Sequence, residues 1–374
     1  MERRAAGHPV ACELELGWDF ANIDFTLAVV RGVNDYCSEY SFATAGSAET
    51  IPSTFIENNR VAAVPVLNSA ELGINKSALV IFSLVDDDST EYSRLRMLRL
   101  FATPDGLLVE QGDEFHLLPK ALTLDAVFTS ENPAALLHSA LETAERPEAP
   151  PGDEELLAPL QSQEVWAAGV TYLRSRTARM AESKEAGGGT FYDKVYDAER
   201  PELFFKATSH RVAAPGRPVR IRADARWSVP EPELTLAINR AGRIFGYTIG
   251  NDMSSRDIEG ENPLYLPQAK VYDRSAALGP CLVVSDELPP PETVIRLEIW
   301  RSDTAVFSGE TSVAQIKRPL PSLAEWLFRE NCFPHGCLLM TGTGIVPPDN
   351  FTLRHGDEIR ITIEPVGTLI NPVA

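Results

Sequence analysis

A strand–turn–strand pattern that carries carboxylates constrains this chain more than any other feature of its sequence. Residues 229–239 (VPEPELTLAIN) have apolar side chains at every second position after Glu233, which is typical of a β-strand. Residues 239–242 (NRAG) are a turn signal, and residues 243–250 (RIFGYTIG) form a second strand-like run. We therefore predict one β-hairpin over this segment.

The hairpin gathers three acidic residues. Glu231 and Glu233 are two positions apart, so a strand directs both side chains to one face. If the turn centres near residues 240–241, Asp252 lies beside about position 230 of the first strand. Three convergent carboxylates repel one another unless a cation neutralises them. Ligation by oxygen alone suits Mg²⁺, Mn²⁺ or Ca²⁺ rather than Zn²⁺, so the sequence predicts a divalent metal site.

Composition limits the partners of the protein. The chain has 374 residues, 44% hydrophobic and 23% charged, as expected of a globular protein large enough for two domains. Its formal net charge of −19 argues against nucleic acid or an anionic membrane as a partner. A small anionic substrate stays compatible with this charge, because a bound cation and a few basic side chains reverse the sign locally.

Cysteine usage and the N-terminus indicate a cytoplasmic protein. The five cysteines have no zinc or redox spacing, so we expect reduced thiols. Arg3-Arg4 is not followed by an apolar segment, which argues against a signal peptide. No apolar run approaches the length of a membrane span.

A proline-rich acidic linker at residues 145–153 (ERPEAPPGD) divides the chain. Before it, we predict a small N-terminal domain over residues 97–150, with an α/β character. This domain is expected to begin at Met97 and to contain three short strands followed by a helix. The strands are Leu98–Phe101, Gly106–Glu110 and Glu114–Pro119, and the helix is Asn132–Thr143.

Residues 1–96 carry no recognisable chemistry and stay unassigned as an N-terminal extension. Residues 78–85 (ALVIFSLV) fit a buried strand. Two interpretations are open for the extension: an added domain, or an over-extended reading frame whose natural start is Met97.

From Gln163 onward the chain is rich in strand patterns, which two helical segments interrupt. Residues 172–197 have helical spacing over Leu173–Lys184 and contain the glycines of residues 187–189, as a lid over a site requires. An ordinary surface helix and loop is the alternative for this segment. Residues 321–330 (PSLAEWLFRE) are predicted to be a helix with Ser322 as its N-cap.

Five motifs occur in an order that resembles the fumarylacetoacetate hydrolase family. They are residues 230–234 (PEPEL), 246–257 (GYTIGNDMSSRD), 270–280 (KVYDRSAALGP), 340–344 (MTGTG) and 353–373 (LRHGDEIRITIEPVGTLINPV). The resemblance covers roughly residues 97–374.

The resemblance implies an α+β, mainly β fold: a mixed β-sandwich roll formed by a catalytic domain over residues 160–374, with the small N-terminal domain in front. It implies a divalent cation that binds a 2-oxo acid or 1,3-dicarbonyl, with Glu231, Glu233 and Asp252 as ligands. These are the same residues that the hairpin pattern selects. Since members of the family commonly form dimers, it also implies a homodimer.

One departure from the family pattern bears on the reaction. Hydrolases of the family follow a Gly-x-Asn-Tyr turn with a His and then a Glu that activate water. Here residues 169–172 (GVTY) are followed by Ser175 and Ala178 at those two positions. A hydrolytic water would lack its general base. Residues 200–208 (RPELFFKAT) and 259–272 (EGENPLYLPQAKVY) instead resemble the branch that dehydrates 2-keto-3-deoxy-D-arabinonate to 2,5-dioxopentanoate.

Elimination from such an acid requires a polarised 2-oxo group, a base for the C3 proton and an acid for the C4 hydroxyl. The resemblance places Lys270 near the metal motif. Glu202, Phe204 and Lys206 share one face of a predicted strand over residues 202–208. We predict Lys270 and Glu202 as the acid/base pair, with no direction assigned.

Substrate-binding roles are predicted for five further residues. Lys206 binds substrate charge, and Thr343 offers a hydroxyl or backbone donor to the substrate carboxylate. Arg256 either anchors charge or pairs with Asp257. Tyr265 and Gln268 are candidates for binding substrate hydroxyls.

The leading hypothesis is a metal-dependent dehydratase of a 2-keto-3-deoxy sugar acid. The alternative within the family is a hydrolase, decarboxylase or tautomerase of acylpyruvates or related diketo acids. The alternative of another class is a sugar-acid binding protein without turnover. The three carboxylates together with Lys270 favour an enzyme, since binding alone requires no base.

Overall fold

The computed structural model describes residues 97–147, 149–182 and 189–374, together with six short strands nearer the N-terminus. Two compact units divide the chain, Met1–Ser89 and Thr90–Ala374. In the first unit the described strands are β1 (Ala11–Leu14), β2 (Phe25–Val30), β3 (Glu39–Thr44), β4 (Ser47–Pro52), β5 (Ile56–Glu57) and β6 (Arg60–Val61). The strand expected over residues 78–85 lies outside the described residues.

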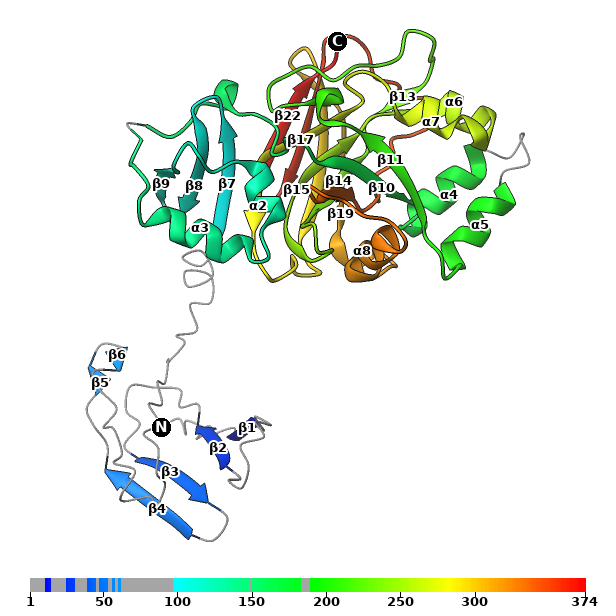
Figure 1. Ribbon diagram of the computed structural model, residues 1–374. Helices are drawn as coiled ribbons and strands as arrows, with labels where there is room; N and C mark the ends of the chain where they lie inside the picture. The colour runs from blue at the N-terminus through cyan, green and yellow to red at the C-terminus, as the bar shows by residue number, and fades with distance from the viewer. Residues whose placement is uncertain are drawn as a thin grey trace, which may run out of the picture. The chain divides into compact units, whose positions relative to one another are not determined.

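A ten-stranded mixed sheet forms the centre of the second unit (Figure 1). Its strands follow the order β11-β10-β20-β14-β15-β17-β7-β8-β9, and β12 also pairs with β17. Their bounds are β7 Leu98–Thr103, β8 Gly106–Gln111, β9 Glu114–Leu117, β10 Glu164–Gly169, β11 Glu202–Ala207, β12 Val212–Ala213, β14 Pro232–Ile238, β15 Ile244–Asp252, β17 Ala276–Val284 and β20 Cys337–Met340.

A second sheet packs against the first. It has the order β19-β18-β21-β22, with β18 Val294–Arg301, β19 Thr304–Ser312, β21 Asp357–Ile363 and β22 Gly367–Pro372. One apolar core joins the two sheets, with Leu234 and Leu236 from β14 beside Leu297 from β18 and Ile361 from β21. The predicted mixed β-sandwich with a mainly β character is confirmed.

The helices of this unit lie around the outside of the two sheets (Figure 1). They are α2 Leu124–Thr129, α3 Pro133–Leu141, α4 Leu173–Glu182, α5 Gly189–Asp197, α6 Arg256–Glu261, α7 Leu266–Lys270 and α8 Leu320–Phe328. Four short 3₁₀ helices are η1 Asp153–Glu155, η2 Ser209–Arg211, η3 Pro263–Tyr265 and η4 Val313–Gln315, and β13 Ser228–Val229 pairs with β16 Ser254–Ser255. In Figure 1, α4 and α5 lie at the opposite end of this unit from β9 and α3.

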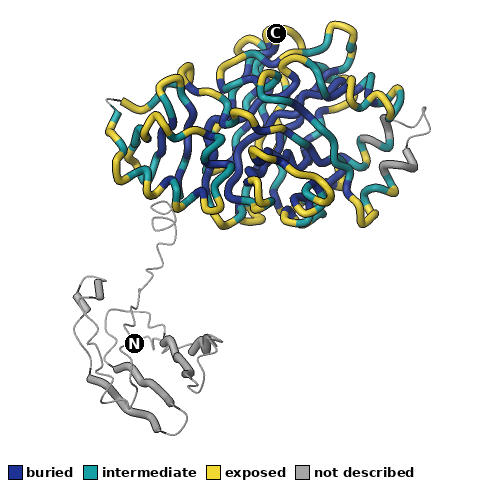
Figure 2. Tube along the Cα trace, viewed as in Figure 1, coloured by how far each residue is buried: buried dark blue, intermediate teal, exposed yellow. Residues whose placement is uncertain are grey.

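The strands β14, β15 and β17 occupy the most enclosed part of the fold. All seven residues of β14 and all nine of β17 are buried, because each strand has a neighbour on both edges and packing on both faces. Figure 2 shows this dark buried centre with exposed residues concentrated at the periphery. A carboxylate placed on β14 or β15 is therefore removed from bulk water.

The N-terminal elements appear close to their predicted bounds. The three strands β7–β9 form one antiparallel run, and Asn132 caps α3 with its side chain, with Pro133 as the first helical residue. The strand β7 pairs with β17, so residues 97–150 share their sheet with the segment predicted to be catalytic. Their standing as a separate small domain stays a prediction.

One helix start was predicted wrongly. The helix α8 begins at Leu320 after an N-cap at Pro319, so Ser322 lies inside its first turn and caps nothing. The Pro319-Leu320-Pro321 run explains the difference, since proline fits the start of a helix where no amide donor is needed. Cys281, Cys332 and Cys337 are free thiols, with Cys281 and Cys337 buried. Among the described residues no helix is long and apolar enough to cross a membrane.

Candidate functional site

The predicted hairpin is formed by β14 and β15, with a register that differs by one residue from the predicted one. Ile238 pairs with Ile244 next to the turn, but a bulge between Ala237 and Ile238 shifts the pairing beyond it. Asp252 consequently lies opposite Glu231 instead of position 230, and the two residues exchange backbone hydrogen bonds of 3.2 and 2.9 Å. The bulge thus brings the Asp252 side chain to the face that Glu231 and Glu233 share.

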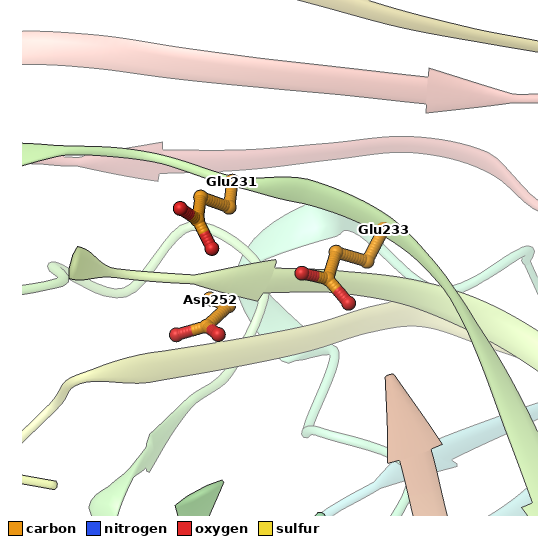
Figure 3. A group of neighbouring side chains, drawn as sticks. All are labelled: Glu231, Glu233 and Asp252. Carbon is orange, nitrogen blue, oxygen red and sulfur yellow. The ribbon is translucent and has the colours of Figure 1, made fainter. Parts of the chain in front are cut away.

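Glu231, Glu233 and Asp252 form a buried carboxylate cluster. Their side-chain oxygens include a set in which all three lie within 4.8 Å of one another, and Figure 3 shows the three groups converging from the neighbouring strands. Their residues are only 4%, 1% and 0% exposed. Burial, followed by the charges of Asp252 and Glu231, raises the pKa of Glu233 well above its ordinary value. The amide of Gly342 donates a hydrogen bond of 2.5 Å to Glu233 Oε2.

Three cationic side chains neutralise this cluster from within the protein. Lys270 Nζ lies 2.6 Å from Glu231 Oε2 and 3.0 Å from Asp252 Oδ2, and it also donates to Ser254 Oγ at 2.6 Å. Arg256 Nη2 donates to Glu231 Oε1 at 2.8 Å. The sequence alone did not predict that cationic side chains pair with the carboxylates, because these basic residues belong to other strands and helices.

Lys206 is the third cation. Its Nζ lies 2.6 Å from Asp252 Oδ1, and its side chain is fully buried. Burial lowers the pKa of Lys206 to about 8, an effect that Asp252 opposes. With three carboxylates and three cations, the group carries no formal net charge when all six are ionised.

The carboxylate cluster fits a hard divalent cation. It offers oxygen ligands only, from three residues close enough to share one ion, and the described residues bring no histidine or cysteine into the group. This donor set is the one that Mg²⁺ prefers and Zn²⁺ does not. A bound divalent cation would give the group a formal charge of +2, which favours an anionic ligand beside it.

A small cavity opens onto the cluster. Its volume is about 10 Å³, which leaves room for about one water or ion. Its walls combine the carboxylate cluster with small residues, one lysine and one aromatic ring: Ala168, Gly169, Val170, Ser175, Phe204, Glu231, Glu233, Asp252, Lys270, Gly342 and Thr343. A ligand larger than one water would therefore require the walls to move outward.

Lys270 and Thr343, two of the predicted site residues, line the cavity. Thr343 uses its hydroxyl in a local turn, where it donates to Ile345 O at 3.3 Å and accepts from Ile345 N–H at 3.1 Å. That hydroxyl is thus committed to the protein, and the backbone amide is the better candidate donor to a ligand.

Glu202 does not line the cavity itself, but it lies next to Gly169, which does. It pairs with Gly169 across β10 and β11, and its carboxylate fills the space that a side chain at position 169 would need. A glycine is thus required at position 169 for the Glu202 carboxylate to lie against the cavity wall. The predicted catalytic pair, Lys270 and Glu202, comes from two separate elements, α7 and β11.

Four predicted substrate-binding residues do not line the cavity. Lys206 and Arg256 are both buried, and Arg256 is ion-paired with Glu231 and not with Asp257, which was one of its two predicted roles. Tyr265 is 38% exposed and Gln268 is also exposed, on η3 and α7 respectively.

Phe204 lines the cavity and was not predicted as a site residue. Lys270 Nζ lies 5.5 Å from the centre of its ring. The alternation of Glu202, Phe204 and Lys206 along β11 was visible in the sequence, but it does not tell which of the three side chains reaches the cavity.

The segment predicted as a lid consists of α4 and α5, and residues 183–188, with Gly187 and Gly188, lie outside the described residues. The base of the segment is held firmly: Arg318 Nη2 donates to the carbonyls of Val195 and Ala198 at 2.8 and 2.7 Å. Lid closure itself stays a prediction.

Ser175 stands where hydrolases of the resembled family have a histidine. It lines the cavity, but its Oγ donates to Tyr172 O at 2.9 Å and accepts from Tyr172 N–H at 3.2 Å. No histidine lines the cavity among the described residues. The cavity therefore offers no imidazole to activate water.

Comparison with known proteins agrees with this geometry. Residues 165–374 match the family model described as fumarylacetoacetate (FAA) hydrolase C-terminal. A probable 2-keto-3-deoxyxylonate dehydratase of Haloferax volcanii is 46% identical over 222 residues, which are 59% of this chain and 75% of that protein. The 2-dehydro-3-deoxy-D-arabinonate dehydratase of Saccharolobus solfataricus is 43% identical over 224 residues, 59% of this chain and 75% of that protein.

A solved structure of 2-keto-3-deoxy-D-arabinonate dehydratase in complex with magnesium and 2,5-dioxopentanoate is also similar. It is 33% identical with a TM-score of 0.61, over 74% of this chain and 98% of that one. The family match spans more than half of the chain, and both dehydratases are covered over three quarters of their length. This chain is therefore a member of the fumarylacetoacetate hydrolase family.

Proposed function

We propose that this protein is a divalent-metal-dependent dehydratase of a 2-keto-3-deoxy sugar acid, a hydro-lyase that converts 2-keto-3-deoxy-arabinonate to 2,5-dioxopentanoate. The observation that carries the proposal is the identity of 46% and 43% to two dehydratases of such acids. A similar solved structure holds both magnesium and this product. The cavity supports the proposal independently, because it combines a cation site with a lysine and lacks a described histidine.

The balance of charge around the cluster suits an enolate. A cation held by Glu231, Glu233 and Asp252 supplies Lewis-acid polarisation of the 2-oxo group when it is bound. It leaves the group with a formal charge of +2. A 2-oxo acid carries one negative charge on its carboxylate, and removal of the C3 proton adds a second. Removal of that proton moves negative charge onto the substrate next to the cation site, so the site favours the charge that develops during the reaction.

Lys270 and Glu202 are the proposed proton-transfer groups. One takes the C3 proton and the other protonates the departing C4 hydroxyl, which together remove one water. Transfer of a further proton from C5 to C3 then gives an enol. This enol becomes the aldehyde of 2,5-dioxopentanoate when the proton of its C5 hydroxyl moves to C4. Lys270 lines the cavity and lies against Glu231, while Glu202 lies beside Gly169 of the cavity wall. The Thr343 backbone amide is proposed to bind the substrate carboxylate, and Tyr265 and Gln268 stay proposed hydroxyl contacts for an opened cavity.

The protein is further proposed to act in the cytoplasm as a homodimer. The expected reduced thiols support the cytoplasmic location. The dimer is implied by the resemblance to a family whose members commonly form dimers. Gel filtration with light scattering would give one species of about twice the chain mass if the dimer forms; a monomer at micromolar concentration would refute it.

An alternative within the family is tautomerisation or decarboxylation, which needs enolate stabilisation without loss of a hydroxyl. An oxaloacetate tautomerase of Bacillus subtilis is 31% identical, but over only 159 residues and 51% of that protein. Hydrolysis of acylpyruvates is disfavoured because Ser175 replaces the expected base. A binding protein without turnover is disfavoured by Lys270 in the cavity wall.

Turnover of the D and L isomers of 2-keto-3-deoxy-arabinonate tests the proposal. We expect 2,5-dioxopentanoate with Mg²⁺, no product with EDTA, and no product from Glu231→Ala with Mg²⁺. Oxaloacetate and an acylpyruvate are assayed in parallel. Cleavage of the acylpyruvate with both pentonates unchanged would refute the dehydratase and show that the protein hydrolyses without a lid histidine. Ligand-induced thermal stabilisation without any product would indicate a binding protein.

A further inference from the structure

The Lys206 ammonium group contacts three oxygen atoms of the protein. Besides Asp252 Oδ1 at 2.6 Å, it donates to Met253 O at 2.9 Å and to Lys270 O at 2.5 Å. Two of the three N–H donors of the ammonium group thus donate to backbone carbonyls, and its charge is paired with that of Asp252. The side chain is 0% exposed and does not line the cavity. Lys206 is therefore placed to act on the protein and not on a substrate directly.

The three oxygen atoms belong to two separate parts of the site. Asp252 and Met253 lie at and after the end of β15, the strand that carries a proposed cation ligand. Lys270 is the last residue of α7, the helix that carries the proposed proton-transfer group. Lys206 itself comes from β11, the far edge of the large sheet. One side chain therefore fixes the ligand strand, the end of α7 and the sheet edge relative to one another.

The contact with Asp252 also sets the orientation of that carboxylate. Lys206 lies against Oδ1 and Lys270 against Oδ2, so the two ammonium groups hold the carboxylate from both sides. Without the Lys206 charge, the Asp252 carboxylate would lose one of its two cations, and two buried carbonyls would lose a donor. A buried carboxylate that loses a partner on one oxygen is less firmly held in one orientation, and a rotated Asp252 would present its oxygens poorly to a cation.

We propose that Lys206 is a positioning residue, which holds Asp252 in the orientation needed to bind a divalent cation and holds Lys270 against the cavity. The effect of Lys206 on cation binding does not depend on which reaction the protein catalyses. The part of the inference that concerns turnover rests on the proposed dehydratase function.

Lys206→Met is the main test, because methionine has a similar length and removes the charge and all three donors. Mn²⁺ binding is measured by calorimetry on the folded protein, without substrate. We expect the Kd for Mn²⁺ to rise about 10- to 100-fold, as is usual when a residue that orients a metal ligand is lost. At saturating Mn²⁺, kcat for the 2-keto-3-deoxy acid should fall about 100-fold, as a misplaced reacting group predicts.

The Michaelis constant separates positioning from substrate binding. For a positioning residue, KM at saturating Mn²⁺ should change by less than about threefold. A large rise in KM with kcat unchanged would overturn the proposal, since it would mean that Lys206 binds substrate. An unchanged Kd for Mn²⁺ in the folded variant would overturn it as well.

Two further variants control for general loss of stability. Leu137→Ala removes a fully buried side chain of α3 in the other hydrophobic cluster, away from the carboxylates, and should lower Tm without changing the Kd for Mn²⁺. Lys206→Gln keeps amide donors but no charge, and it replaces Lys206→Met if the latter does not fold. The two proposals can also fail separately. If the wild type binds Mn²⁺, Lys206→Gln does not, and the wild type turns over no pentonate, then the inference about cation binding stands and the proposed function is wrong.

Discussion

Lys270 Nζ lies 2.6 Å from Oε2 of Glu231, so the proposed proton-transfer residue is ion-paired with a proposed cation ligand. The same Nζ contacts Asp252 Oδ2 at 3.0 Å. Lys270 and a divalent cation are therefore attracted by the same carboxylates. A cation bound by Glu231 and Asp252 would weaken their attraction for Lys270, which would leave the ammonium group better able to interact with a substrate.

Replacing Lys270 by methionine should separate catalysis from cation binding. We expect kcat to fall about 10²- to 10⁴-fold, the usual contribution of an acid/base group. The metal-free protein should lose stability, because Glu231 and Asp252 lose their shared cation in a buried site. Thermal unfolding with and without Mg²⁺ checks this: the stabilisation by Mg²⁺ should be larger in Lys270→Met than in wild type. Equal stabilisation in the two proteins would contradict the shared-carboxylate account.

Two variants test whether the Glu202 carboxylate takes part in catalysis: one removes it, and the other displaces it by a change at Gly169. In Gly169→Ala the new methyl group would overlap that carboxylate and push it away from the cavity wall. We expect Glu202→Gln to lower kcat about 10²- to 10⁴-fold and Gly169→Ala to lower it in the same direction. Glu199→Gln, at an exposed position nearby, is the matched control and should leave kcat unchanged. Full activity in Glu202→Gln would remove Glu202 from the acid/base pair.

Phe204 should limit the length of the substrate, because it is the large apolar side chain among the small and polar residues of the cavity wall. Phe204→Leu enlarges the cavity without removing apolar character. The ratio of kcat/KM for a six-carbon to a five-carbon 2-keto-3-deoxy acid should rise about tenfold or more, the usual effect of one methylene in a pocket. A constant ratio, measured by competition between the two acids, would show that another wall sets the length.

Asp125 should make the stability of the fold depend on acid pH. Burial by itself raises the pKa of Asp125, but hydrogen bonds from Ser162 and Gln163 outweigh it and bring the pKa below its ordinary value. A carboxyl group with a lowered folded pKa stabilises the protein above its unfolded pKa of about 3.9, and this stability is lost as the pH falls through the folded pKa.

Denaturant unfolding at several pH values checks the role of Asp125. Asp125→Asn should lower the unfolding free energy by about 1 kcal/mol at pH 7, and the difference from wild type should shrink below about pH 4. Glu131→Gln, at an exposed position, provides the control. A difference that stays constant down to pH 3 would show that the charge of Asp125 contributes nothing.

The hairpin was predictable from sequence because both of its determinants are local. Period-two alternation in β14 and the turn after Ile238 specify a hairpin without reference to the rest of the chain. The bulge between Ala237 and Ile238 was not predictable, since the alternation of side chains continues through it without a signal. It changed the partner of Asp252 by one residue and left the conclusion about the carboxylates intact.

The counter-charges of the cluster were beyond local reasoning. Lys206 is 46 residues from Asp252 in the chain, and their contact forms only when β11 folds back past β10 onto the sheet. The sequence pattern placed Glu202, Phe204 and Lys206 on one face, but it did not tell which end of that strand faces the cavity. Tyr265 and Gln268 were selected by their position in a motif, and the structure places both on the outer surface.

The proposed cation ligands lie on the hairpin and the other cavity residues lie on other elements, which has an evolutionary consequence. All three proposed cation ligands belong to one continuous segment of 22 residues, whereas Lys270, Glu202, Phe204 and Ser175 come from α7, β11 and α4. Substitutions in those outer elements can replace one reaction by another while the ability to polarise a 2-oxo acid is inherited unchanged. Lineages that share this hairpin are thus free to diverge in chemistry at the cost of only a few side chains.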